Sequence, residues 1–183
     1  MVLVVLILFF SIFIRVCFEE LEHLGYNDKT MKKIRVYLDT SVIGGCFDEE
    51  FKEHSILLMD EIISRGKLGV ISATTVKELS KAPKQVTDYF EKIYHYLEEL
   101  KPSDEINELA NTYLLENIVT EKYYEDLLHI ATATINQVDV LVSWNFKHIV
   151  HYKKIPLYNA VNTLKGYKTI QIYSPREVIN YEE

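Results

Sequence analysis

Residues 34–41 read IRVYLDTS, in which a short run of β-forming side chains ends abruptly in an acid and two hydroxyl residues. A strand over Ile34–Leu38 followed by a turn is the natural interpretation. Two further short runs, Leu68–Ser72 (LGVIS) and Asp139–Ser143 (DVLVS), have the same character. The last of these is apolar on both faces, as in parallel sheets that helices cover on both sides. These runs predict a sheet of buried strands.

Helical periodicity separates these strands. It predicts helices over Phe51–Arg65, Thr74–Leu79, Gln85–Leu100, Glu105–Glu116 and Glu121–Gln137. Weaker patterns predict a short helix after Asn145, strands at Ile155–Tyr158 and Thr169–Tyr173, and a last helical turn at Pro175–Asn180. Alternating strands and helices imply right-handed crossovers, and hence a three-layer α/β/α fold around a mostly parallel central sheet.

Composition and charge narrow the class of protein. A chain of 183 residues, 48% hydrophobic and 26% charged, is typical of one globular domain. The net charge of −7 argues against a protein that coats nucleic acid through bulk charge. It does not argue against an enzyme that meets nucleic acid through bound metal ions. Cys17 and Cys46 are too few for a disulfide scaffold, which fits a reducing compartment such as the cytoplasm.

The first 30 residues differ from the rest. Met1–Ile14 is a nearly unbroken apolar run that rises about 21 Å as a helix, short of the ~30 Å hydrocarbon core of a bilayer. It suits a marginal membrane anchor, a hydrophobic arm for a partner, or upstream sequence outside the working protein. We favour the last, because Met31 opens a basic lead into the first strand. Residues 1–30 are then an apolar segment plus polar linker, residues 31–183 form the domain, and membrane contact is expected only if residues 1–18 are retained.

Acids collect where the predicted strands end, which is where sites form in open parallel sheets. Asp39 follows the first strand, Glu78 comes six residues after the second, and Asn145 follows the third. Asp126 lies inside the helix predicted over Glu121–Gln137, which is apolar on nearly every side. A carboxylate there loses solvation and must neutralise or find a cation. Three acids and one amide at converging ends predict a site for a hard cation with oxygen ligands.

Each of these residues also has a purely structural interpretation. Asp39 suits a turn cap, and Asn145 suits a helix N-cap. Thr75 with Glu78 fits a capping box, in which Glu78 reaches back to the start of its helix. Asp126 is the hardest to explain in this way, because its helix is almost entirely apolar.

The histidines and tyrosines favour structural roles. His129, one turn after Asp126, is expected to be a satisfied core or cap-facing histidine rather than a catalytic one. His148 and His151 are interpreted as structural or surface residues near the end of a short helix. The 13 tyrosines include candidates for stacking on bases, but packing is the commoner use of this side chain.

Together these residues resemble a known family. The chain from Ile34 to Ile179 resembles a PIN domain, the metal-dependent ribonuclease fold found in VapC-like toxins. Four stretches carry the resemblance: residues 37–41 (YLDTS), 76–79 (VKEL), 126–133 (DLLHIATA) and 140–146 (VLVSWNF). Their order and spacing agree with the family.

The resemblance implies a site and a function. Asp39, Glu78 and Asp126 match the family's three best-kept acids and would hold Mg²⁺ or Mn²⁺. Asn145 stands where the family often has a fourth acid, which implies that a second metal binds more weakly. The implied activity is that of a divalent-metal-dependent endoribonuclease, the toxin of a toxin–antitoxin pair, with RNA as substrate, an antitoxin as partner and a homodimer as assembly.

Supporting residues and alternatives complete the expectation. Thr40 and Ser41 are expected to hydrogen-bond Asp39 or a phosphate oxygen, and Ser143 to support the same site.

A PIN-like module that binds RNA or protein without cutting is the main alternative, because the fourth acid is missing. A phosphatase of the haloacid dehalogenase type needs a second Asp two residues after the first, where this chain has Ser41. A flap-type DNA nuclease usually needs more acids and more basic surface.

Overall fold

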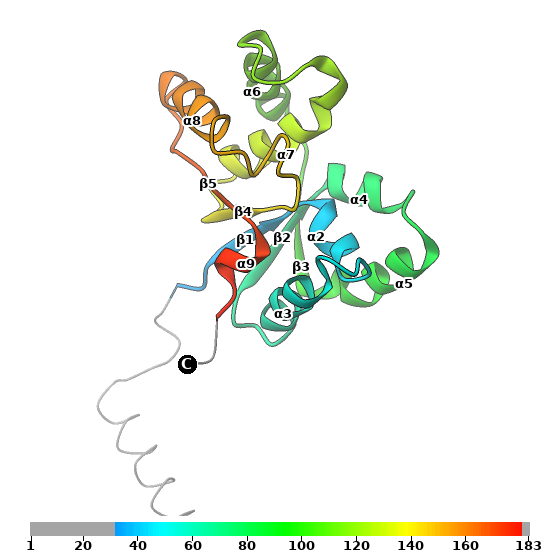
Figure 1. Cartoon of the computed structure of the whole chain (residues 1–183). Helices are drawn as coiled ribbons and strands as arrows, with labels where there is room; N and C mark the ends of the chain where they lie inside the picture. The colour runs from blue at the N-terminus through cyan, green and yellow to red at the C-terminus, as the bar shows by residue number, and fades with distance from the viewer. Residues whose placement is uncertain (1–31, 181–183) are drawn as a thin grey trace, which may run out of the picture. The chain divides into compact units, whose positions relative to one another are not determined.

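A five-stranded, entirely parallel sheet organises the computed structural model, which describes residues 32–180 (Figure 1). The strand order is β3-β2-β1-β4-β5, with β1 in the middle. The strands are β1 (Arg35–Leu38), β2 (Leu68–Ser72), β3 (Leu97–Leu100), β4 (Val140–Val142) and β5 (Gln171–Tyr173). The predictions for residues 1–30 lie outside the described residues. Within residues 32–180, no helix is long and apolar enough to span a bilayer.

Helices connect the strands and cover both faces of the sheet. They are α2 (Thr40–Gly45), α3 (Lys52–Ile63), α4 (Ala73–Leu79), α5 (Lys84–Ile93), α6 (Asp104–Leu115), α7 (Tyr124–Ile135), α8 (Ile155–Leu164) and α9 (Pro175–Val178). Two 3₁₀ turns, η2 (Tyr94–Tyr96) and η3 (Glu121–Tyr123), precede β3 and α7. In Figure 1, α6, α7 and α8 lie over one face, and α3, α5 and α9 lie over the other.

The alternation of side chains along the central strand divides the core in two. Tyr37 packs into the cluster that contains the buried residues of α6, α7 and α8. Val36 and Leu38 point to the opposite face, into the cluster formed with α2, α3 and α5. A strand that is buried on both faces reads as a continuous apolar run, as β1 and β4 do. The predicted three-layer α/β/α fold is therefore confirmed.

The helix predicted over Gln85–Leu100 is wrong in its second half. Helix α5 ends at Ile93, and β3 pairs with β2 in parallel, Leu97 opposite Gly69 and Leu100 opposite Ser72. The side chain of Leu97 lies over the bare backbone of Gly69, where an added Cβ would stand only 2.6 Å from Leu97 Cδ2. The two consecutive glutamates in β3 have low β-propensity, so the sequence does not predict a strand here. Pairing with β2 at the edge of the sheet nevertheless makes these residues a strand.

Two further predictions around α8 are wrong. Residues 155–158, predicted as a weak strand, form the first turn of α8, and Pro156 at the start of this helix is the signal that favours it. After Asn145 the chain makes a turn closed by Ile149 N–H on the Asn145 carbonyl at 3.0 Å, not a helix. His148 and His151 therefore lie in a connecting loop.

Candidate metal centre

Three titratable side chains meet at the carboxyl edge of the central strands. Asp39, Glu78 and His129 each offer one ligand atom, and these atoms lie within 4.8 Å of one another. They come from the end of β1, from α4 and from α7. Asp39 and His129 are buried, whereas the Glu78 side chain is 26% exposed. The edge that the sequence predicts as a site therefore carries a compact acidic group.

The pairing register of β1 with β4 places Asp39 beside the residues that hydrogen-bond it. Leu38 pairs with Val142, so Asp39 and Ser143 leave adjacent strands side by side, and Asp39 N–H donates to the Val142 carbonyl at 3.1 Å. Ser41 Oγ and Ser143 Oγ both donate to Asp39 Oδ2, at 2.5 and 2.6 Å. The other oxygen, Oδ1, lies 3.4 Å from His129 Nε2. Two hydroxyl donors thus fix the carboxylate and leave Oδ1 facing the cluster.

Glu78 is not the capping residue of its own helix. Ser72 caps α4, and Thr75 closes the capping box with it, so the capping interpretation of Glu78 is wrong. The Glu78 side chain instead accepts a hydrogen bond from Thr40 and lies 3.1 Å from His129 Nε2. Burial works to raise the pKa of Glu78, but the contact with His129 outweighs it, and the pKa is lower than usual. Glu78 is therefore ionised in the cluster.

His129 is a buried histidine, as expected, but it is also part of the site. Its Nδ1 lies 2.8 Å from Tyr37 Oη, and Tyr37 in turn donates to Ser72 Oγ at 2.7 Å. Burial opposes the charged imidazole, yet Tyr37, Glu78 and Asp39 together raise its pKa above the ordinary value. The sequence signal for this role is its spacing of three residues from Asp126, which puts both on one helix face.

Asp126 adjoins this group without belonging to it. It lies in the first turn of α7, where Oδ1 accepts a hydrogen bond from Asn145 Nδ2 at 3.0 Å. Its Oδ2 is buried and has no hydrogen-bond partner among the described residues. Burial first, and then the charge of Asp39, raise the pKa of Asp126 to about 6. An orphaned carboxylate oxygen beside two other acids is a donor set that suits a divalent cation.

Asn145 uses both ends of its amide. Its Oδ1 accepts the His148 N–H at 3.0 Å and so caps the turn that follows, while Nδ2 holds Asp126. Its own N–H donates to Ser143 Oγ at 2.8 Å. Asn145 thus combines the capping role with the positioning of Asp126.

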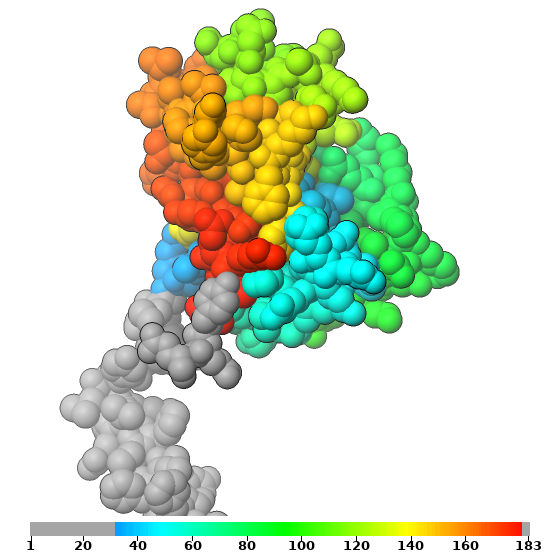
Figure 2. Space-filling view, in the orientation of Figure 1, coloured from blue at the N-terminus to red at the C-terminus, as the bar shows by residue number. Residues whose placement is uncertain are grey.

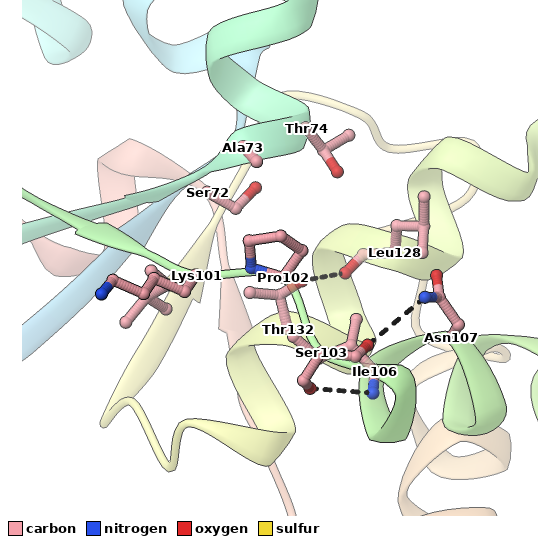
Figure 3. Close-up of a pocket in the computed structure, with 11 residues that line it drawn as sticks. Ser72, Ala73, Thr74, Lys101, Pro102, Ser103, Ile106, Asn107, Leu128 and Thr132 are labelled. Atoms are coloured by element: carbon pink, nitrogen blue, oxygen red, sulfur yellow. Dashed lines mark hydrogen bonds between the residues drawn. The ribbon is translucent and has the colours of Figure 1, made fainter.

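A separate hollow lies between the ends of β2 and β3, the first turn of α6, and α7 (Figure 3). Its volume is about 180 Å³, and none of the acids lines it. It is lined by Ser72, Ala73, Thr74, Leu100, Lys101, Pro102, Ser103, Ile106, Asn107, Leu128 and Thr132. Ser72 links this hollow to the acidic group through Tyr37 and His129.

The comparisons with known proteins place the fold. No family model matches the chain, and no curated protein matches it. Solved structures do match: VapBC2 from Rickettsia felis bound to a promoter DNA fragment has a TM-score of 0.54 and 18% identity, over 77% of this chain and 98% of that one. DNA-bound VapBC from Salmonella typhimurium has a TM-score of 0.53 and 16% identity, over 78% and 98%.

A third match points to the same fold. VapBC-1 from nontypeable Haemophilus influenzae has a TM-score of 0.52 and 17% identity, over 78% of this chain and 99% of that one. The matches span nearly the whole of each solved chain and more than three quarters of this one. The described part of this chain therefore has the PIN-like α/β/α fold of the VapBC toxin–antitoxin structures, as its sequence predicts.

Proposed function

We propose that the chain is a divalent-metal-dependent endoribonuclease that hydrolyses RNA phosphodiester bonds, and that it acts as the toxin of a toxin–antitoxin pair. The observation that carries this proposal is the buried, unpartnered Oδ2 of Asp126, beside Asp39 and Glu78 at the carboxyl edge of a PIN-like sheet. Burial and the charges of Asp39 and Glu78 disfavour the ionised form of Asp126 in the metal-free protein, and a cation among the three carboxylates would offset this cost.

The donor set favours Mg²⁺ or Mn²⁺ as the cofactor, because hard cations select carboxylate oxygens. Asp39, Glu78 and Asp126 would hold the ion. When bound, such an ion activates water and stabilises negative charge on the scissile phosphate. In-line attack of water is expected to leave a 5′-phosphate and a 3′-hydroxyl.

The remaining residues hold these acids in place. Ser41 and Ser143 keep one oxygen of Asp39 occupied, so that the other is presented to the ion. Thr40 orients Glu78, and Asn145 orients Asp126. His129 lies between Asp39 and Glu78, where a positive imidazole balances their charge in the metal-free protein.

A small antitoxin is the proposed protein partner. The solved structures of similar fold are VapBC and FitAB assemblies, and another is described as a toxin–antitoxin complex. We infer that an antitoxin of this chain would occlude the acidic edge, and that the chain itself forms a homodimer. Light scattering of the purified full chain would test the homodimer.

A binding module without catalysis is the second candidate. It is favoured by Asn145, whose amide replaces a carboxylate and is already committed to Asp126 and to the His148 N–H. A module of this kind should bind RNA or protein equally well in chelator. It should also gain no thermal stability from Mn²⁺.

The proposed activity is tested by incubating the full chain with a mixed pool of transfer and messenger RNA. The reactions contain Mn²⁺, Mg²⁺ or EDTA, and Asp39→Asn serves as the control variant. Cleavage that requires both the metal and Asp39 is the expected result. Cleavage of equal extent in EDTA, or by folded Asp39→Asn protein, would overturn the proposed metal-dependent mechanism.

A further inference from the structure

Four lysines without an ion pair in the described part of the chain gather near Asp126, in a protein with an excess of acids. Lys122 lies in η3, and Lys147, Lys153 and Lys154 lie between β4 and α8. Within residues 32–180, none of these four forms an ion pair, whereas Lys67, Lys77 and Lys84 each have a carboxylate partner. Figure 2 shows the segment after β4, coloured yellow to amber, at the surface toward the viewer. A local positive surface therefore adjoins the acidic cluster.

Electrostatic and covalent links fix this surface next to Asp126. Asp126 and Lys154 lie close enough for an electrostatic interaction. Asn145, which holds Asp126, is two residues before Lys147. Tyr123 is the N-cap of α7, three residues before Asp126. An anion bound by these lysines would thus lie beside the acids.

Tyr123 gathers the lysines around one aromatic ring. Lys147 Nζ donates to Tyr123 Oη at 3.1 Å and lies 5.1 Å from the ring centroid, and Lys122 Nζ lies 5.7 Å from it. The ring of His148 packs against Tyr123 with centroids 3.8 Å apart. These contacts link the side chains into one unit, which we call the lysine–tyrosine patch (Lys122, Tyr123, Lys147, His148 and Lys154).

His148 has a donor that finds no acceptor. The residue is 6% exposed, and its Nδ1 lies 2.8 Å from Lys154 Nζ. Burial and the nearby lysines lower its pKa to about 4, so the ring is neutral at pH 7. With Nδ1 accepting from the lysine, the ring proton is on Nε2, which is buried and without a partner among the described residues. One ring donor of the patch, His148 Nε2–H, therefore has no acceptor among the described residues.

We propose that the lysine–tyrosine patch binds a backbone phosphate of the RNA strand, next to the phosphate that the acidic cluster cleaves. This inference rests on the proposed function. Exposed Phe146 and Tyr152 flank the lysines and offer faces on which bases stack. The alternation of cations with aromatic rings matches the alternation of phosphate and base along a single strand. A carboxylate-rich protein segment would use the cations but not the rings, which favours RNA.

The test measures binding of a fluorescent single-stranded 12-mer RNA by anisotropy, with the full chain in EDTA at 25–150 mM NaCl. The variant Lys147→Ala/Lys154→Ala is compared with wild type and with Lys165→Ala/Lys168→Ala. The control pair removes the same charge from two exposed lysines that also have no ion pair among the described residues. Lys122→Ala/Lys147→Ala, at two exposed sites, is the second variant in case loss of Lys154 unfolds the loop.

Each patch variant should bind RNA about tenfold or more weakly, and the slope of log affinity against log salt should fall by about 0.7 per lysine that contacts phosphate. The control pair should stay within about twofold of wild type. An equal loss of RNA affinity in the control pair would show that only net charge matters, and it would overturn the proposed phosphate site. So would absence of RNA binding by wild type at 25 mM salt. If an acidic peptide competes with RNA for the same lysines, and if Phe146→Ala and Tyr152→Ala do not weaken RNA binding, the ligand of the patch is a protein segment and not RNA.

Cleavage assays separate this inference from the proposed function. If the patch variants cut RNA in Mn²⁺ with an unchanged KM, the patch is wrong and the nuclease stands. If wild type binds RNA through the patch but cuts nothing in any metal, the patch stands and the nuclease is wrong.

Discussion

Asp126 is a carboxylate that folding places at a disadvantage. Its pKa rises to about 6 in the folded chain because of burial and the charge of Asp39. The ionised form therefore destabilises the metal-free fold; the penalty is fully present above about pH 6 and disappears as the pH falls toward 4. A cation that neutralises Asp126 would recover the lost stability. The unfavourable ionisation of Asp126 and the proposed metal binding therefore have the same cause, which is a buried carboxylate beside Asp39.

The variant Asp126→Asn should make the metal-free protein more stable. Its amide oxygen can still accept from Asn145, while the repulsion from Asp39 is gone. Each pKa unit corresponds to about 1.4 kcal/mol, and after discounting for solvent at this half-buried site we expect a gain of about 1–2 kcal/mol at pH 7. Urea unfolding in EDTA at pH 7 and pH 4.5 measures it, and the gain should shrink at the lower pH. An Asp126→Asn protein that is less stable than wild type at pH 7 would contradict this account.

Tyr37 reaches the acidic cluster through His129. Removing its hydroxyl in Tyr37→Phe leaves His129 Nδ1 and Ser72 Oγ without this partner, at a cost of about 1–3 kcal/mol. It should also weaken Mn²⁺ binding, because His129 is freed to shift against Glu78. Tyr113→Phe is the matched control, since Tyr113 is equally buried on the same face of the sheet and hydrogen-bonds Asn162 instead. Equal Mn²⁺ affinity in the two variants, by calorimetry, would show that Tyr37 does not position the cluster.

Asn145 stands where the family that the chain resembles often has a fourth acid. The variant Asn145→Asp tests whether this position contributes to metal binding. The new carboxylate would stand at hydrogen-bond distance from Asp126, where the amide now donates. We expect the metal-free protein to lose about 1–2 kcal/mol through repulsion of two carboxylates. Mn²⁺ should restore more stability than it does in wild type, which thermal unfolding with and without the ion would measure. A variant that Mn²⁺ stabilises less than wild type would argue against a role of this position near the ion.

At the scale of elements, the site depends on strands that end together. Strands β1, β2 and β4 are predictable because each is a short apolar run between turn signals. The third acid is predictable because α7 is otherwise apolar. β3 is not predictable in this way, since its two central residues are glutamates and its partner is set by the bare backbone of Gly69. The contact between His129 and Tyr37 cannot be predicted for a similar reason, because the two residues are 92 positions apart in the sequence.

Gly69→Ala should therefore loosen the edge of the sheet. An added Cβ would stand 2.6 Å from Leu97 Cδ2 and 2.8 Å from Ile62 Cγ2, so β3 and α3 must shift. Overpacking of this kind usually costs about 1–3 kcal/mol. Gly44→Ala is the control, because nothing lies within 4 Å of a Cβ there and the residue is helical. Equilibrium unfolding compares the two, and equal stability would show that the contact of Leu97 with Gly69 does not set the position of β3.

At the scale of the whole molecule, acidic and basic side chains gather on separate, neighbouring surfaces. The chain has 27 acids against 20 basic residues, yet one loop beside the acidic cluster carries lysines without ion pairs among residues 32–180. The net charge argues against a protein that coats nucleic acid, but it does not reveal this local surface, because the lysines of η3 and of the loop after β4 are far apart in the sequence. Folding brings an acidic edge and a basic surface together, as the proposed cleavage of RNA at a metal ion would require.

The central claim is that Asp39, Glu78 and Asp126 together form a divalent metal site. Titration of the full chain with Mn²⁺ by calorimetry at pH 7 tests it most directly, because the result does not depend on knowing the RNA target. The account predicts a saturable site in wild type that is lost in Asp126→Asn. No binding at millimolar Mn²⁺ by folded wild-type protein, or equal binding by Asp126→Asn, would contradict it.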